Sequence, residues 1–68
     1  MDNQQQPTPQ PLLISVEGAA NLLQIGRTAA WELVRKKKIA SVKIGRTRRI
    51  PMTAIYDYVT KLLEGEAA

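Results

Sequence analysis

The 68-residue sequence contains no cysteine and no histidine, and its only aromatic residues are one tryptophan and two tyrosines. Without Cys or His the chain has no disulfide, no thiolate or imidazole for catalysis, and none of the usual zinc ligands. Because a nucleophile, a base and an orienting group cannot be assembled, we expect a protein that is not an enzyme and that uses no metal or other cofactor. Its fold must depend on packing or on a partner.

Long apolar runs are also absent. The N-terminus lacks the basic and then apolar regions of a secretory signal, and no run approaches the roughly 20 residues that span a bilayer. We therefore expect a soluble protein in the cytoplasm of its host cell, without a membrane partner. The length allows one small domain of marginal stability, with no room for a separate effector or catalytic domain.

Positive charge is abundant and unevenly distributed. Nine of the ten Lys and Arg residues lie between Arg27 and Arg49, where the only acid is Glu32, so this segment carries +8. The remaining residues carry −4, and the total of +4 therefore conceals a strongly polarised molecule. A basic surface of this kind suits a polyanion, and we interpret it as a DNA-binding surface.

The first part of the chain predicts a tail and a helix. Residues 1–11 are rich in Gln and Pro and have no apolar periodicity, which predicts a disordered N-terminal tail. Apolar residues then recur at helical spacing from Val16 to Leu23, with Ser15 in the position of an N-cap. This pattern predicts a first helix over about residues 16–23.

A short break at residues 24–26 predicts a turn into a second helix over about residues 27–37. Its apolar stripe consists of Ala30, Leu33 and Val34. The other face combines donors and acceptors, as a recognition helix needs towards a DNA groove. Its members are Arg27, Thr28, Trp31, Glu32 and Arg35.

The apolar period changes after Ile39. Val42 and Ile44 alternate with polar neighbours, and Ile50 follows Arg49, which predicts two short strands around a loop of Gly45, Arg46 and Thr47. Such a hairpin presents Arg46 at its tip.

A third helix is predicted from residue 52 to residue 63, after Pro51 ends the strand pattern. We expect it to close the core through the stripe Ile55, Tyr58, Val59, Leu62 and Leu63, and to stop at Gly65. Tyr56 lies off the stripe, where it can help two protomers to meet. The fold class is thus mostly α with a small β-hairpin, as a domain over residues 12–63 followed by a C-terminal tail at 64–68.

Three segments resemble the excisionase-type helix-turn-helix domains, which are relatives of the DNA-binding domain of the MerR regulators. They are residues 16–20 (VEGAA) with Leu22 and Leu23, the segment from Arg27 to Arg35, and residues 42–46 (VKIGR) followed by residues 49–51 (RIP). The similarity covers about residues 12–63. Lys37 departs from the family pattern, because it stands where the family often has Gly at the end of the second helix.

The resemblance implies a winged helix-turn-helix with the second helix in the major groove and the hairpin wing on the adjacent backbone or minor groove. It also implies a phage recombination directionality factor: a small nucleoid-associated protein that binds several attachment-site repeats in double-stranded DNA, self-associates there, bends the DNA and helps an integrase to excise a prophage. A small transcription regulator on a promoter or operator is the alternative. A third possibility is a protein-binding adaptor whose basic face meets acidic partners.

Eleven residues are the candidate DNA-binding site: Arg27, Thr28, Trp31, Glu32, Arg35, Lys36, Lys38, Lys43, Arg46, Thr47 and Arg48. Arg27 and Thr28 open the second helix, where side chains meet either base edges or phosphates. Arg35 is better placed for phosphate. Arg46 suits a narrow minor groove, and Lys43 and Arg48 suit the flanking phosphates.

Several of these residues also have a purely structural interpretation. Glu32 can accept a hydrogen bond from cytosine, but an ion pair with Lys36 is favoured. Trp31 can touch a thymine methyl group, but partial packing on the core against the wing is favoured. Residues 36–38 either complement the helix dipole or attract the DNA backbone. Arg49 is expected to pair with an acid such as Glu17 or Asp57.

Overall fold

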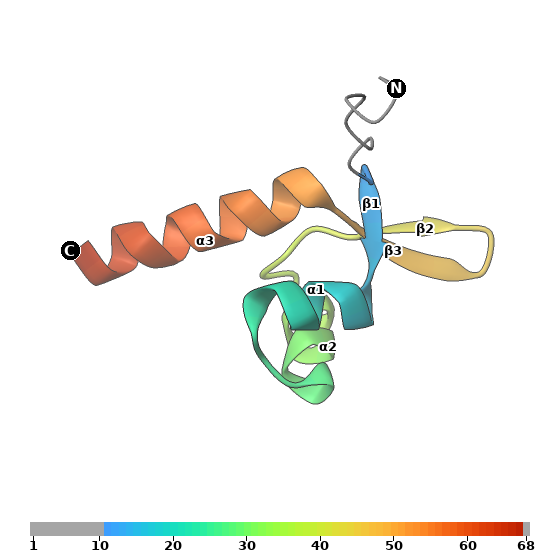
Figure 1. Cartoon of the computed structure of the whole chain (residues 1–68), viewed down its shortest axis with the longest axis horizontal. Coiled ribbons are helices and arrows are strands. Elements are labelled where there is room, and N and C mark those ends of the chain that lie inside the picture. The colour runs from blue at the N-terminus through green and yellow to red at the C-terminus, as the bar shows by residue number, and fades with distance from the viewer. Residues whose placement is uncertain (1–10, 68) are drawn as a thin grey trace, which may run out of the picture.

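Three helices and a three-stranded antiparallel sheet form the fold, in a computed structural model that describes residues 11–67 (Figure 1). The elements in chain order are β1 (Leu13–Ser15), α1 (Val16–Leu23), α2 (Arg27–Arg35), β2 (Val42–Ile44), β3 (Thr47–Pro51) and α3 (Met52–Ala67). This arrangement confirms a helix-turn-helix followed by a wing. The tail predicted over residues 1–11 lies, apart from Pro11, outside the described residues.

Local capping explains why α1 occupies the predicted range. The Gly18 amide donates to the Ser15 side-chain oxygen at 2.9 Å, which satisfies one of the free amides of the first turn. At the other end Gln24 takes a left-handed conformation, with φ of 59°, and the Ile25 amide donates to the Ala20 carbonyl at 2.9 Å. The chain thereby turns into α2, whose N-cap is Gly26.

The end of α2 is strained at Lys37. This helix ends at Arg35, slightly before the predicted residue 37, and the Lys37 and Lys38 amides donate to Val34 and Leu33 carbonyls at 3.1 and 2.9 Å. That pair of bonds is the Schellman motif, which places a left-handed residue just after the helix. Lys37 occupies the left-handed position with φ of 61°, where a β-carbon is unfavourable.

Replacing Lys37 by glycine is therefore expected to stabilise the domain. Lys37→Gly and Lys37→Ala remove the same charge, but only glycine relieves the left-handed strain, so we expect the glycine variant to be roughly 1 kcal/mol more stable than the alanine variant. Urea unfolding followed by circular dichroism measures the difference. Equal midpoints for the two variants would show that the conformation at Lys37 carries no strain.

Strand β1 was not predicted, and it changes the sheet from a hairpin to three strands in the order β1-β3-β2. Ile14 is opposite Ile50 and Ser15 is opposite Arg49, so the residues just before α1 pair with the second arm of the wing. Three residues are too few to show a period-two pattern. The central position of β3 is the reason that Ile50 is buried.

The wing is a tight hairpin of β2 and β3 with a two-residue turn at Gly45 and Arg46. Gly45 has a positive φ of 61° and Arg46 does not, which is the pattern of a type II′ turn and the reason for glycine at this position. Arg46 lies at the tip, as expected. Thr47 was assigned to the loop, but it is the first residue of β3 and pairs with Ile44.

The core is small and lies where α1, β3 and the start of α3 meet. Its buried members are Val16, Ala19, Ala20, Ala30, Ile39, Ile50 and Ile55. Alanines on α1 and α2 allow the two helices to approach closely. Buried side chains on α3 are confined to its first turns, where Ile55 is buried and Tyr58 is half-buried.

Two predictions about α3 are wrong. The helix does not stop at Gly65 but continues to Ala67, so residues 64–67 are helical. Its stripe does not close the core along its whole length either, because Leu62 and Leu63 are 49% and 64% exposed. Figure 1 shows the reason: α3 leaves the sheet and projects away from α1 and α2, and its principal packing partner is β3.

Candidate nucleic-acid interface

Helix α2 has the two faces that were predicted. Ala30 is buried, and Leu33 and Val34 pack against the core, whereas the Arg27, Thr28 and Arg35 side chains are exposed. The exposed face is continuous with the Lys36 to Lys38 segment at the C-terminal end of the helix. A protruding helix whose polar face is free in this way has the geometry of a recognition helix.

Both arginines of α2 are already paired with acids. Arg27 Nε lies 3.2 Å from a carboxylate oxygen of Glu17, so the first turn of α2 is tied to α1. Arg35 Nη2 donates to Glu32 Oε2 at 2.6 Å, and Lys36 Nζ lies 3.7 Å from the other oxygen of Glu32. The predicted ion pair of Glu32 with Lys36 is confirmed, and Arg35 is its nearer partner.

These ion pairs favour the ionised form of Glu32. The hydrogen bond from Arg35 lowers the pKa of Glu32 below its usual value, and desolvation opposes this shift. Glu32 is therefore an ionised acceptor on the recognition face at neutral pH. All of the paired side chains remain substantially exposed, so their cations can exchange the carboxylate for a phosphate at little cost.

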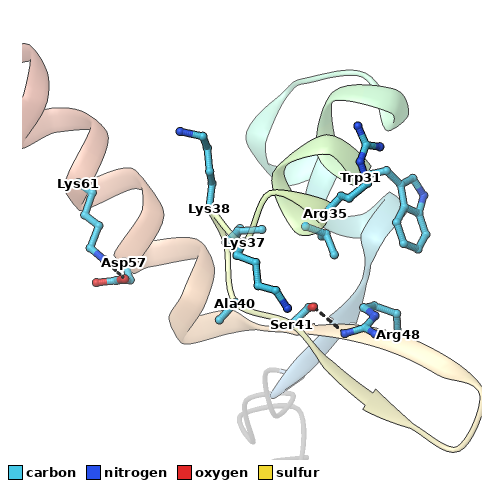
Figure 2. Close-up of a pocket in the computed structure, with 11 residues that line it drawn as sticks. Trp31, Arg35, Lys37, Lys38, Ala40, Ser41, Arg48, Asp57 and Lys61 are labelled. Atoms are coloured by element: carbon cyan, nitrogen blue, oxygen red, sulfur yellow. Dashed lines mark hydrogen bonds and ion pairs between the residues drawn. The ribbon is translucent and has the colours of Figure 1, made fainter.

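A basic groove lies between α2, the segment after it, the wing and α3. It encloses about 730 Å³, and its lining includes Trp31, Arg35, Lys38, Arg48 and Lys61. Figure 2 shows Trp31 and Arg35 on one side, Arg48 from the wing below them, and Lys61 with Asp57 from α3 on the opposite side. The groove thus brings together residues that are distant in the sequence.

Trp31 belongs to this groove rather than to the core. The sequence favoured its packing against the core, but the structure leaves its side chain 40% exposed. It lines the groove together with Arg35 and Arg48 (Figure 2). An exposed indole beside two guanidinium groups offers an apolar surface for a base methyl group or a sugar.

The wing places like charges opposite each other. Lys43 and Arg48 are directly paired across β2 and β3, an arrangement that is unfavourable unless an anion lies between the cations. Arg48 Nη1 also donates to Ser41 Oγ at 3.0 Å, which directs the guanidinium towards the groove (Figure 2). The wing therefore concentrates positive charge at the edge of the groove. Sequence reasoning missed Ser41, for which no local pattern gave a signal.

Arg49 does not have the partners that were expected. Glu17 pairs with Arg27, and Asp57 pairs with Lys61 at 3.4 Å. The residue lies on the central strand and its side chain is half-buried. The difference arises from the tertiary arrangement, in which Arg27 reaches Glu17 across the junction of α1 and α2.

No cluster of acids that could hold a metal ion is present within residues 11–67. None of the described helices has both the length and the apolar character needed to cross a membrane.

The helix-turn-helix, the free face of α2 and the cationic hairpin define the class of the protein, a winged helix-turn-helix DNA-binding domain. A family model described as a helix-turn-helix domain matches residues 13–62. The chain is 48% identical over 60 residues to a probable excisionase of Saccharopolyspora erythraea, and 37% identical over 57 residues to an excisionase of Streptomyces ambofaciens. It belongs to the family of excisionase-type helix-turn-helix DNA-binding proteins.

The two alignments differ in how much of each relative they include. They cover 88% and 84% of this chain, respectively. The chain spans 61% of the length of the Saccharopolyspora protein and 90% of the Streptomyces protein. No solved structure matches the chain.

Proposed function

We propose that the chain is a sequence-specific, architectural DNA-binding protein that acts as an excisionase-like recombination directionality factor. In this function it binds attachment-site repeats in double-stranded DNA cooperatively, bends the DNA and promotes excision of a prophage by an integrase. The observation that carries the proposal is the basic groove, which places Arg35 of α2 and Arg48 of the wing on one surface. Family membership supports the same function.

In the docking that this surface supports, the protein contacts the duplex at two places, the major groove and the adjacent backbone. Helix α2 enters the major groove with Arg27 and Thr28 first, because recognition helices contact base edges through their N-terminal turn. Arg35, Lys36 and Lys38 then lie near the phosphates that flank the groove. The wing follows the adjacent backbone, where a phosphate between Lys43 and Arg48 relieves their repulsion.

Arg46 provides the remaining contact at the tip of the wing. The turn holds this exposed residue ahead of both strands, which is the position that a narrow minor groove can accept. Engagement of two grooves by one small domain favours a bent path of the duplex, because bending lets more of the DNA meet the protein. Bending by several neighbouring copies is the architectural contribution to excision.

Alanine substitutions of Arg27 and Arg46 test the docking. Arg27→Ala is expected to weaken binding roughly tenfold or more and to change the sequence preference, because a base contact contributes about 1–3 kcal/mol. Arg46→Ala is expected to weaken binding to all sequences more uniformly. Gel-shift titrations on specific and scrambled duplexes measure both effects.

Lys61→Ala is the comparison for these variants, because it removes the same unit charge from the α3 side of the basic groove, where Asp57 already pairs with Lys61 at 3.4 Å. Its effect should be smaller than that of either arginine variant. If all three substitutions had the same effect, charge alone would explain binding, and the winged-helix docking would be wrong.

Excision itself requires an assay with an integrase. Purified protein is added to an in vitro excision reaction on attachment-site DNA, with footprinting in parallel. Stimulated excision together with several phased footprints supports the proposal. Occupancy of a single promoter or operator without any effect on recombination would instead identify a small transcription regulator, the alternative that keeps the same fold.

A further inference from the structure

An exposed apolar face runs along α3 and onto α1. Its large side chains are Leu22, Tyr56, Val59, Leu62 and Leu63, all of them exposed. Between the two helices this face is hollowed into an apolar groove lined by Leu22, Leu23, Met52, Tyr56 and Val59. Contiguous apolar surface of this extent on a small domain marks an interaction site.

The sequence of α3 has the spacing of a helix-pairing seam. Met52, Ile55, Val59 and Leu62 alternate steps of three and four residues, which is the a and d pattern of a heptad, and Tyr56 and Leu63 widen the same face. The first half of this seam meets the rest of the domain, where Ile55 is buried. The second half has no such cover, because α3 projects away from α1 and α2 (Figure 1).

Charge limits which partner fits this face. No charged residue lines the apolar groove, so it has nothing to pair with DNA or with a charged peptide. Asp57 and Lys61 of α3 lie away from this groove, since they pair with each other and both line the basic groove. Two copies can therefore meet through the apolar face with their basic surfaces apart and free for DNA.

We infer that the occupant is a second copy of this chain, with the α3 seams of the two copies packed against each other around a two-fold axis. A two-fold contact uses the same patch on both subunits, and the seam positions from Met52 to Leu62 carry no charge, so this patch is compatible with itself. The inference identifies the surface through which copies associate during the cooperative binding of the proposed function. It rests on that function only for the experiments with DNA.

The exposed area predicts a weak dimer. At roughly 100 Å² for each half-exposed large side chain, five such residues offer on the order of 500 Å² per copy, or about 1,000 Å² for two copies. That total is near the lower limit of specific interfaces. Copies on adjacent DNA sites gain a high effective concentration, so a contact too weak to persist in dilute solution becomes cooperative loading on DNA.

The variant that tests the surface is the double substitution Leu62→Gln with Leu63→Gln. Both side chains are exposed in the single copy, so the variant should fold, and its thermal unfolding at low concentration checks this. Leu12→Gln is the matched control, because Leu12 is an exposed leucine outside the seam, and its backbone hydrogen bond from Met52 is kept in the variant. All three proteins are compared without DNA and on duplexes with one or two sites.

Concentration-dependent sedimentation of wild-type protein without DNA should show a monomer and dimer equilibrium that the double variant shifts at least tenfold towards monomer. On a two-site duplex the double variant should lose at least tenfold in cooperativity while its single-site affinity stays unchanged. Leu12→Gln should behave as wild type in both measurements.

Two results would overturn the inference: a wild-type protein that stays monomeric without DNA and loads two sites independently, or a double variant that associates as the wild type does. The first result would mean that the seam binds a different protein. A wild-type protein that does not bind the single-site duplex would instead contradict the proposed function. The sedimentation result would still show whether the dimer forms.

Discussion

Raising the monovalent salt concentration from about 50 to about 200 mM should weaken DNA binding by about 10³-fold. Seven exposed cations lie on the proposed DNA-binding surface: Arg27, Arg35, Lys36, Lys38, Lys43, Arg46 and Arg48. If about five to seven phosphates are neutralised, the logarithm of affinity falls with the logarithm of salt with a slope near −0.9 for each phosphate. Fluorescence anisotropy on a short duplex measures this slope.

The individual contributions can be separated with charge-removing variants. The double substitution Lys43→Gln with Arg48→Gln should reduce the slope by about 0.9, because it removes the one phosphate contact that the two cations share. Lys61→Gln on α3 should change the slope less, because Asp57 already pairs with Lys61 at 3.4 Å. A wild-type slope near zero would show that the basic segment does not bind a polyanion, and the protein-binding adaptor would then be the better interpretation.

Replacing Ile50 by alanine is expected to remove a large fraction of the stability of the domain. Ile50 is 1% exposed and lies on the central strand, so truncation costs about 2–5 kcal/mol. A domain of this size has a total stability on the order of 3–9 kcal/mol, and the loss is therefore a large fraction of it. Urea unfolding followed by circular dichroism gives the change.

Two further variants show that the effect belongs to the buried position. Ile50→Val removes one methyl group and should cost about 0.5–1.5 kcal/mol. Ile44→Ala lies on the same hairpin, but its side chain is 57% exposed, and such surface changes are usually within about 0.5 kcal/mol. A similar loss for Ile44→Ala and Ile50→Ala would mean that the core does not centre on β3.

Elements with strong local signals were predictable from the sequence. The range of α1 follows from apolar spacing and the Ser15 cap, both of which act within a few residues. The wing follows from the change of period after Ile39, and glycine at residue 45 marks its turn. The free face of α2 follows from the spacing of Ala30, Leu33 and Val34, which left the candidate recognition residues on the other side.

Contacts between distant segments were not predictable. Strand β1 forms because Ile14 pairs with Ile50 of β3. The ion pair between Arg27 and Glu17 depends on how α2 packs on α1. Trp31 and Arg48 meet at one groove for the same reason. Local patterns contain no information on these distances, because the energy of each contact depends on where the remainder of the chain places its partner.

The sequence by itself determined the polarised charge, the helix-turn-helix and wing, and the family, because these depend on local periodicity and on the order of residue types. The tertiary structure decided which side chains share the basic groove and how far α3 is covered. A helical stripe shows which residues lie on one face, but it does not show whether anything packs against that face. For Leu62 and Leu63 the remainder of the described chain supplies little such cover, because α3 turns away from the small core after Tyr58.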